Sequence, residues 1–129
     1  MPKGNAYKTA TLQSNLIDNG NTFLALFSTN PGADGSGTEV VYDGYERKAI
    51  TWGTPAINGS VGEIKNTTLI EFTVVPTSTG VIAAYAAVMS AQTVGQGNVI
   101  YYGALGANYP LIQGVKPTLP IASLTVTET

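Results

Sequence analysis

Residues 22–55 read TFLALFSTNPGADGSGTEVVYDGYERKAITWGTP, and this stretch predicts how the rest of the chain is organised. It begins with a short apolar run, FLALF at residues 23–27, which is typical of a buried strand. An Asn-Pro-Gly turn ends the run, because Pro31 lacks a donor N–H and glycine permits a reversed backbone. A polar, glycine-rich loop then leads to residues 45–52, whose alternation predicts a second strand. We expect the later strands to pack onto these two.

Several short runs after residue 55 predict further strands separated by turns. The Asn58-Gly59 pair predicts a hairpin, since a type I′ turn needs positive φ at both central residues. Alternation over residues 68–75 predicts a strand that turns Ile70, Phe72 and Val74 toward the core. Strands are also expected at residues 39–42, 60–65, 81–91, 98–105 and 118–127, the last with Leu124 and Val126 inward.

The segment VIAAYAAVMSA at residues 81–91 is open to two interpretations. Its alanine content is compatible with a helix. The interspersed Val, Ile and Tyr and the flanking turns favour a strand buried on both faces instead. We therefore predict a strand here.

The N-terminal part differs from the rest. Apolar residues between Ala10 and Ile17 fall near one face at helical spacing, and an Asp-Asn-Gly stop follows, so residues 7–18 predict one short helix. Residues 1–8 predict an arm that becomes ordered on contact. With about seven to nine short strands over residues 22–127, the pattern predicts a single all-β domain of residues 1–129. The expected architecture is an antiparallel β-sandwich, immunoglobulin-like or jelly-roll-like in connectivity.

The composition excludes several classes of function. Only 11% of the residues are charged, against roughly 25% in soluble domains. The net charge is −2 and no basic run occurs, which argues against a nucleic-acid binder. The chain has neither cysteine nor histidine, which excludes disulfides, Ser-His-Asp triads and metal sites built on these residues.

Neither a secretory signal nor a membrane span is expected. The N-terminal residues lack an apolar h-region, and the longest apolar run, residues 81–89, falls far short of the roughly 20 residues that a membrane helix needs. We expect a protein made in a cytoplasm, without a membrane partner.

Acidic residues give no convincing catalytic or metal site. Asp34 and Glu39 flank a loop with two hydroxyls, but the spacing of an EF-hand is not met, and a flexible loop is the favoured interpretation. A glycosidase needs two facing carboxylates, and no spacing singles out such a pair. The candidates weighed are Glu39, Asp43, Glu46, Glu63 and Glu71. We therefore predict no catalytic residue, no metal, no cofactor and no enzymatic activity.

Four residues are candidates for a protein interface. Arg47 is the only arginine, and its guanidinium suits either an ion pair across an interface or an intramolecular one; both remain open. Tyr109, beside Pro110, is the aromatic residue expected to be most exposed. Lys3 and Lys8 lie on the arm, where they can reach a neighbouring subunit.

The other aromatic side chains have alternative interpretations. Together with Tyr109 they form either a platform for sugar rings or the anchors of a protein interface. These residues are Tyr45, Trp52, Tyr101 and Tyr102. Core packing is the third interpretation, and it is favoured for Trp52 and Tyr85.

The ordered set of these segments resembles a family of small tailed-bacteriophage virion proteins. Members share a strand ending in a TxP turn, matched at Thr29 and Pro31, and a Gly/Thr/Glu loop, matched at residues 37–39. A GYxRxAxTWG strand follows, matched at residues 44–53. The similarity continues in the same order through NT at 66–67, IEF at 70–72, YYGAL at 101–105 and LTVT at 124–127.

This resemblance implies a structural protein of the virion, in a family that includes head decoration, head-fibre and tail-fibre proteins. The favoured interpretation is a capsid decoration (cement) protein on the capsid exterior, binding the major capsid protein, itself, or both, with a trimer as one arrangement. Lys3 and Lys8 would then reach across a neighbouring subunit. The alternative is a tail-associated, fibre-like adhesion protein whose Tyr109 and other loop aromatics contact glycan on the host surface.

Overall fold

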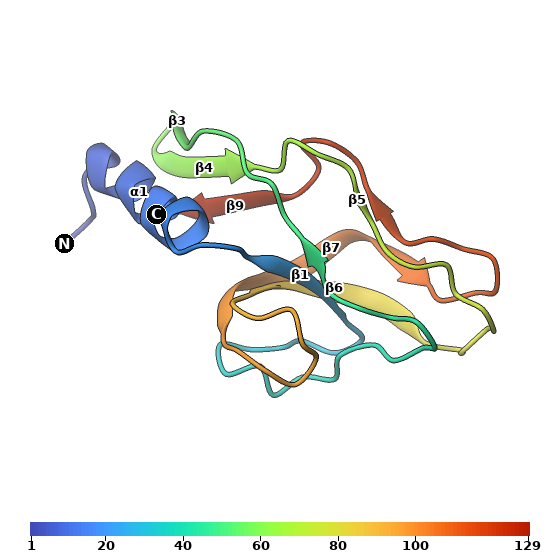
Figure 1. The fold of residues 1–129 in the computed structure, drawn as a ribbon. Helices are drawn as coiled ribbons and strands as arrows, with labels where there is room; N and C mark the ends of the chain where they lie inside the picture. Colours follow the sequence, from blue (N-terminus) through green and yellow to red (C-terminus); the bar gives the residue numbers. More distant parts are fainter. The chain divides into compact units, whose positions relative to one another are not determined.

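The computed structural model describes residues 1–129 and confirms an all-β antiparallel fold with one short helical segment at the N-terminus (Figure 1). Three sheets have the strand orders β2-β1-β6-β7, β3-β4-β9 and β5-β8. The strands are β1 (Phe23–Phe27), β2 (Lys48–Ala49), β3 (Ala56–Asn58), β4 (Val61–Lys65), β5 (Ile70–Glu71), β6 (Ile82–Met89), β7 (Val99–Pro110), β8 (Thr118–Leu119) and β9 (Thr125–Glu128).

The chain divides into two compact units, each built from segments that are distant in sequence. Unit 1 contains Met1–Asn21, Ile50–Ile70 and Leu119–Thr129, and unit 2 contains Thr22–Ala49 and Glu71–Thr118. The three-stranded sheet belongs to unit 1 and the four-stranded sheet to unit 2. The chain passes from one unit to the other at four points, after Asn21, after Ala49, within β5 and within β8.

In unit 1, a helical segment packs on the three-stranded sheet (Figure 1). The α-helix α1 (Asn5–Leu12) continues into a turn of π-helix, η1 (Gln13–Asp18). Leu12 and Leu16 are buried, as are Ile64 and Val126 on the sheet. The close approach of α1 to β4 depends on Gly62, where an added Cβ would lie 2.9 Å from the Cβ of Lys8.

The helix begins earlier than predicted, so the expected arm of residues 1–8 is only partly an arm. The carbonyl of Gly4 accepts hydrogen bonds from the backbone N–H groups of Tyr7 and Lys8, each at 3.1 Å. The Lys8 bond is the first i→i−4 bond of the helix, and the Tyr7 bond satisfies an N–H group that would otherwise lack a helical partner. Asn5 is therefore helical, although the predicted helix began at Tyr7.

The predicted hairpin joins β3 to β4, with its turn one residue later than expected. Asn58 pairs with Val61, so the two loop residues are Gly59 and Ser60. Gly59 has φ +66°, at the loop position where type II′ turns place glycine. Asn58 itself remains in the ladder.

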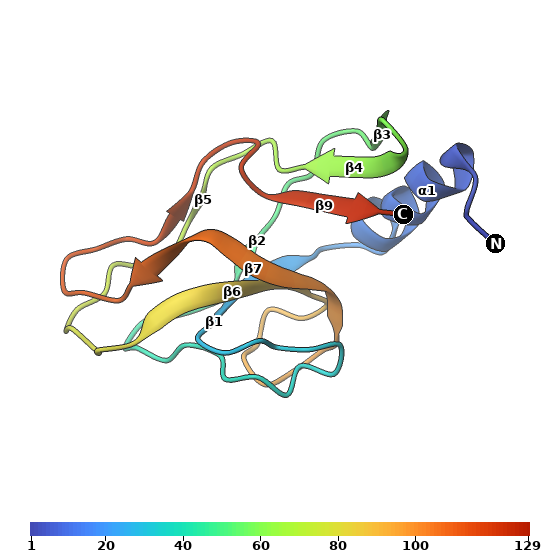
Figure 2. The same ribbon diagram turned by 180° about the vertical axis from the view of Figure 1, so that it is seen from behind.

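In unit 2, the apolar run of β1 forms an inner strand, as predicted. It pairs with β2 on one side and with β6 on the other, and four of its five residues are buried. Residues 86–89 of β6 are buried in succession, which confirms a strand covered on both faces. Figure 2 shows β6 between β1 and the long strand β7.

The strand predicted at residues 45–52 is reduced to the two residues of β2. The physical reason is that side-chain and loop contacts replace the ladder beyond Leu24. The backbone N–H of Leu26 donates to the hydroxyl of Tyr45 at 3.1 Å, and the carbonyl of Leu26 accepts from Val40 at 3.0 Å. Residues 45–47 therefore lie beside β1 without pairing to it through their backbone.

Two predicted strands are interrupted by changes of direction. After β5 the alternation shifts by one residue, so Val74 is exposed and Val75 is buried. The N–H of Val75 donates to the carbonyl of Val115 at 2.9 Å, which places this residue inward. The strand expected at 118–127 is split into β8 and β9, because residues 120–124 turn around the buried side chain of Asn66.

Candidate functional site

The most elaborate polar arrangement in the molecule surrounds Arg47 in unit 2. Arg47 is 2% exposed and lies immediately before β2. Its Nη2 donates to Oε1 of Glu39 at 2.8 Å, and its Nε donates to Oε2 at 3.0 Å. This two-point pairing is the strong geometry that a planar guanidinium makes with a carboxylate. Of the two alternatives for Arg47, the structure shows the intramolecular ion pair.

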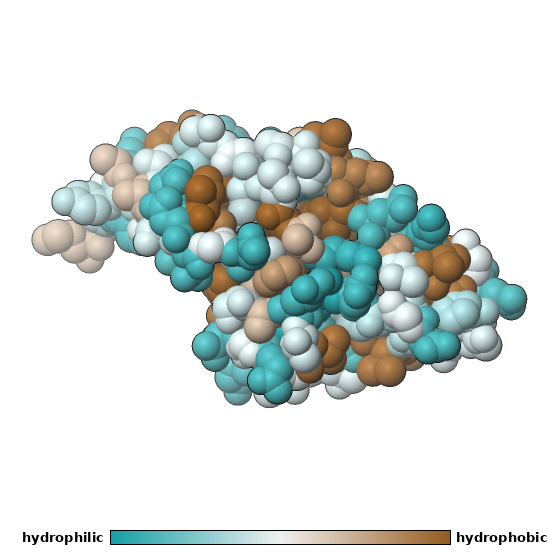
Figure 3. All heavy atoms as spheres, viewed as in Figure 1, coloured by the Kyte–Doolittle hydropathy of each residue, from teal (hydrophilic) through white to brown (hydrophobic).

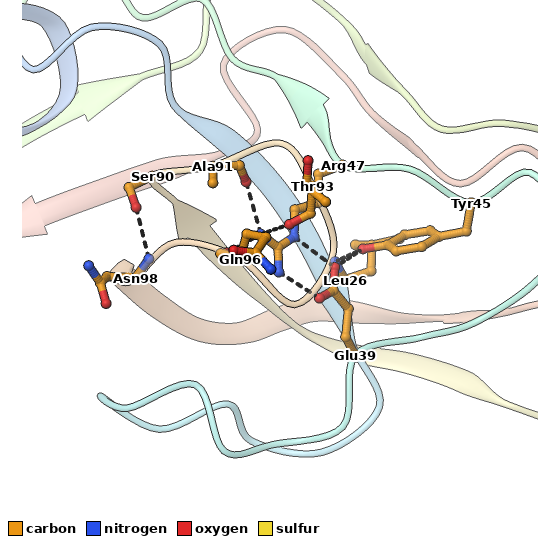
Figure 4. Close-up of polar contacts among 9 residues, drawn as sticks. All are labelled: Leu26, Glu39, Tyr45, Arg47, Ser90, Ala91, Thr93, Gln96 and Asn98. Atoms are coloured by element: carbon orange, nitrogen blue, oxygen red, sulfur yellow. Dashed lines mark hydrogen bonds and ion pairs between the residues drawn. The ribbon is translucent and has the colours of Figure 1, made fainter.

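The third nitrogen of the guanidinium holds the loop between β6 and β7. Nη1 donates to the carbonyl oxygens of Ala91 at 2.9 Å, Thr93 at 3.1 Å and Gln96 at 2.8 Å (Figure 4). The base of the same loop is closed by Asn98, whose N–H donates to Oγ of Ser90 at 2.8 Å. One side chain thus fixes the backbone of residues 91–96.

Tyr45 completes this group by linking the ion pair to β1. Its hydroxyl donates to Oε2 of Glu39 at 2.7 Å and accepts the N–H of Leu26. Its ring stacks on Phe72 with centroids 6.1 Å apart. Burial, and then the hydrogen bond to the Glu39 carboxylate, raises the pKa of Tyr45 far above its ordinary value. The phenol therefore stays protonated and acts as a fixed donor.

The Arg47 group has the properties of a structural device. Every nitrogen of the guanidinium donates within the chain, and both carboxylate oxygens of Glu39 accept hydrogen bonds. No buried side-chain nitrogen or oxygen in the molecule lacks a partner. Its chemical role is to hold the β6–β7 loop and the segment of Glu39 against β1.

Tyr109 is not the exposed loop residue that was predicted. It lies within β7, opposite Ala83, and is only partly exposed. Its hydroxyl donates to the carbonyl of Thr118 at 3.0 Å. The prediction failed because β7 extends through residues 106–110 instead of ending at Leu105. The tyrosines that are largely exposed are Tyr7 and Tyr102.

Lys3 and Lys8 both lie in unit 1 and make contacts within it. Lys8 is buried, and its Nζ donates to the carbonyl of Ser60 in the β3–β4 turn. Lys3 is partly exposed, with Nζ 3.4 Å from Oε2 of Glu128 on β9. The two lysines therefore attach the N-terminal segment to its own sheet. Arg47 and Tyr109 lie in unit 2, so the four candidates form no single cluster within either unit.

The carboxylates that were weighed as catalytic or calcium-binding residues have separate surroundings. Oδ1 of Asp34 accepts the N–H of Ser36 at 3.1 Å, and hydrogen bonding from Ser36 lowers the pKa of Asp34. Glu39 pairs with Arg47, so the two acidic residues of this loop have different partners. The remaining ion pairs of these glutamates join Glu46 to Lys48, Glu63 to Lys65, and Glu71 to Lys116. No group of three or more Asp, Glu, His or Cys residues is placed to hold a metal ion.

Unit 1 contains an open hollow of about 380 Å³ beside its three-stranded sheet. Its wall includes Asn66, whose side chain is 1% exposed and makes three hydrogen bonds. Nδ2 donates to the carbonyls of Thr68 at 2.8 Å and Pro120 at 3.0 Å, and Oδ1 accepts the N–H of Leu124 at 2.9 Å. Ala122, also in the wall, has φ +62°. The hollow lies over a turn that this asparagine shapes.

Apolar side chains reach the surface in both units, and Figure 3 shows apolar and polar residues interspersed on one face of the molecule. In unit 2 the exposed ones are Val41, Val74, Ile82, Val94, Tyr102, Ile112 and Val115. Sequence reasoning did not identify Tyr102 or the β7 edge as exposed. The sequence between Glu71 and Lys116 has no charged residue, so it gave no signal of this exposure.

The helices of the structure are all too short or too polar to cross a membrane.

Comparison with known proteins identifies the family. The family model described as podophage GP4 fiber I protein gp80 matches residues 8–127, nearly the whole chain. No curated protein matches the chain. The match covers both compact units and includes Glu39, Tyr45 and Arg47. The chain therefore belongs to the family of podophage GP4 fiber I protein gp80, a fibre-like family of phage virion proteins.

Proposed function

We propose that this chain is a fibre-type structural subunit on the outside of a phage particle, where it binds a neighbouring virion protein or another copy of itself. The observation that carries the proposal is the family match over residues 8–127, since the matched family is described as a fibre protein. The internal pairing of the buried charges and the exposure of apolar side chains support a role in assembly. The only strongly buried charge pair, Arg47 with Glu39, is satisfied internally, and exposed apolar side chains remain for neighbours to cover.

A second candidate is decoration of the head, with the subunit bound to the major capsid protein and stabilising the shell. Its support is the construction of the chain. Two of its loops are held by buried polar groups at Arg47 and Asn66, and loops fixed in this way suit repeated seating on a lattice. Adhesion to host glycans has weaker support, because the hydroxyl of Tyr109 is bonded to Thr118. Exposed Tyr7 and Tyr102 would have to supply the sugar contacts.

The test is to count and locate this chain in purified phage particles. Quantitative mass spectrometry would give its copy number relative to the major capsid protein, and gold-labelled antibody would give its position by electron microscopy. A small, fixed number of copies at discrete sites supports the fibre-type subunit. Hundreds of copies distributed over the head support decoration instead, and absence from the particle overturns both.

A further inference from the structure

The chain contains two Asn-Gly pairs, Asn19-Gly20 and Asn58-Gly59, and all four residues are exposed in unit 1. The side chain of an asparagine in such a pair can lose its amide without an enzyme, because the backbone nitrogen of the next residue can attack Cγ. Glycine as the next residue leaves this path open, since it has no Cβ. Both pairs are therefore candidates for a chemical modification, and their surroundings differ.

The attack requires rotation about the Cα–C bond of the asparagine, and the backbone restrains the two asparagines differently. Asn58 is paired with Val61 in the β3–β4 ladder, so the rotation would break this pair. Asn19 lies just beyond η1 and belongs to no strand. The rotation there moves Gly20, whose N–H donates to the carbonyl of Ile17 at 3.4 Å. This distance is longer than the usual range of about 2.7–3.2 Å, so the restraint at Asn19 is the weaker one.

The side-chain amides are also held differently. Nδ2 of Asn58 donates to Oε2 of Glu63 at 3.3 Å, which keeps this amide beside the ladder. The amide of Asn19 makes no hydrogen bond with another group of the chain. A Cβ added at Gly20 would meet no atom within 4 Å, so the neighbouring residues leave room for Gly20 to move. At Asn19, both the group that is attacked and the group that attacks are therefore less restrained.

We propose that Asn19 is a site of spontaneous deamidation, which proceeds through a cyclic imide formed with Gly20. The nitrogen of Gly20 gives its proton to the solvent and bonds to Cγ of Asn19. The bond from Cγ to Nδ2 breaks, and Nδ2 takes up a proton from the solvent and leaves as ammonia. Water then opens the imide. Its attack at Cγ gives aspartate, and its attack at the backbone carbonyl carbon gives isoaspartate, in which the chain continues through the former side chain.

Either product places a new negative charge at the C-terminal end of the helical segment formed by α1 and η1. The carbonyl groups at a helix C-terminus already carry partial negative charge, so a carboxylate there is unfavourable. Asp18 lies next to it, and Oδ1 of Asp18 accepts a hydrogen bond from Nε2 of Gln13 at 3.0 Å across η1. Isoaspartate also lengthens the segment between η1 and β1 by one methylene group. We therefore expect deamidation to loosen η1.

This inference goes beyond the proposed function, because the reaction needs only the chain and water. For the test, the purified full chain is incubated in warm, mildly alkaline buffer made with oxygen-18 water and is then digested in ordinary water. Trypsin places Asn19 in the peptide of residues 9–47 and Asn58 in that of residues 49–65, and fragmentation in the mass spectrometer locates each lost amide. We expect Asn19 to be modified several-fold faster than Asn58, with oxygen-18 incorporated and with both aspartate and isoaspartate formed. In urea, which removes the restraint on Asn58, the two rates should become similar.

Asn19→Asp tests the consequence, and Asn58→Asp is the matched control, because it adds the same charge at an exposed position of the same unit. We expect hydrogen exchange of the η1 amides to become several-fold faster in Asn19→Asp and to stay unchanged in Asn58→Asp, with circular dichroism to verify that both variants are folded. If Asn19→Asp did not fold, exchange would be compared in the natural chain before and after incubation. Equal or faster loss at Asn58 in the folded chain, a ratio of rates unchanged by urea, or aspartate without isoaspartate would overturn the proposal. Equal exchange of η1 in the two variants would overturn the expected loosening.

Discussion

Arg47 in unit 2 and Asn66 in unit 1 both anchor a distant loop, the first through a charged guanidinium and the second through a neutral amide. Each is almost completely buried, at 2% and 1% exposure, and each uses its side chain to hold a distant loop by backbone carbonyls. Arg47 holds residues 91–96, and Asn66 holds the turn at residues 120–124. The charged residue needs Glu39 as a counter-ion, whereas the neutral amide needs only donors and acceptors. The comparison teaches that a buried loop anchor depends on complete hydrogen bonding, and that a charge adds a second requirement.

The largest expected effect is that of breaking the charged anchor. Arg47→Ala leaves Glu39, 11% exposed as a side chain, without its counter-ion. It also removes the Arg47 donor from three carbonyls, of which that of Thr93 still accepts the N–H of Gln96. We expect a loss of about 3–5 kcal/mol in the free energy of unfolding, because removing one partner of a buried ion pair leaves the other charge uncompensated. Urea denaturation followed by tryptophan fluorescence measures this loss.

Two controls show whether the loss of stability comes from an uncompensated buried charge. Arg47→Met combined with Glu39→Leu removes both charges and should lose clearly less stability than Arg47→Ala alone. Lys116→Ala breaks a pair whose side chains are 55% and 47% exposed and should change stability by less than about 1 kcal/mol. If Arg47→Ala were as mild as Lys116→Ala, the Arg47 group would not be an anchor.

Breaking the neutral anchor should have a smaller effect. Asn66→Ala removes three side-chain hydrogen bonds and takes the side-chain partner from the N–H of Leu124 and the carbonyl of Thr68, whereas the carbonyl of Pro120 still accepts from Ser123. We expect a loss of about 2–3 kcal/mol in the free energy of unfolding, since each unsatisfied buried group carries a desolvation penalty but no charge is left uncompensated. Asn58→Ala, at an exposed position of the β3–β4 hairpin, is the matched control. A loss for Asn66→Ala larger than that for Arg47→Ala would reverse the comparison.

The phenol of Tyr45 makes the charged anchor sensitive to alkaline pH. The pKa of Tyr45 is raised in the folded state, so its contribution to stability is complete below the unfolded pKa, about 10, and is lost as pH rises above that value. Tyr45→Phe should lower stability by about 1–2 kcal/mol at neutral pH, because it removes the hydrogen bonds to Glu39 and Leu26. It should also flatten the decline between pH 9.5 and 11.5.

Stability against pH is to be measured for the natural chain, for Tyr45→Phe and for Tyr102→Phe, which alters an exposed phenol. Tyr102→Phe should retain the alkaline decline. An identical decline in all three proteins would show that the phenol of Tyr45 does not govern it.

The smallest expected effect is at the turn beside the neutral anchor. Ala122 has φ +62°, a conformation that disfavours any side chain with a Cβ. Ala122→Gly should relieve this strain and raise stability by less than about 1 kcal/mol, with part of the gain offset by the greater freedom of glycine in the unfolded chain. Thermal unfolding by calorimetry measures the shift. Ala107→Gly, at an exposed position without positive φ, should not raise stability.

The parts of the fold that could be predicted from the sequence are those with local signals. The apolar run of β1, the strand β6 and the Asn-Gly hairpin each follow from neighbouring residues, and the structure has all three. The strand at residues 45–52 could not be predicted correctly, because the hydroxyl of Tyr45 takes the place of a ladder bond at Leu26. A side-chain hydrogen bond that replaces a backbone hydrogen bond leaves no periodic pattern in the sequence.

The candidate site could be predicted only in outline. The uniqueness of Arg47 marked it as a residue with an acidic partner, but its other acceptors are the carbonyls of Ala91, Thr93 and Gln96. Carbonyl groups are common to all residues, so the sequence carries no sign of them. Asn66 stands between polar neighbours and gave no indication of burial. The long uncharged edge of β7 was readable in the sequence, yet its exposure depends on the strand order.

The partners of Arg47 become available in a fixed order as the chain is synthesised. Glu39 precedes Arg47 by eight residues, whereas the last carbonyl that Nη1 reaches belongs to a residue 49 positions later. A growing chain therefore contains the counter-ion of the guanidinium, Glu39, long before it contains the carbonyl groups that accept hydrogen bonds from Nη1. A product truncated before the β6–β7 loop would retain a paired but incompletely bonded charge beside β1, in the interior of unit 2. Only a chain that extends through Gln96 can therefore provide all the acceptors of the guanidinium.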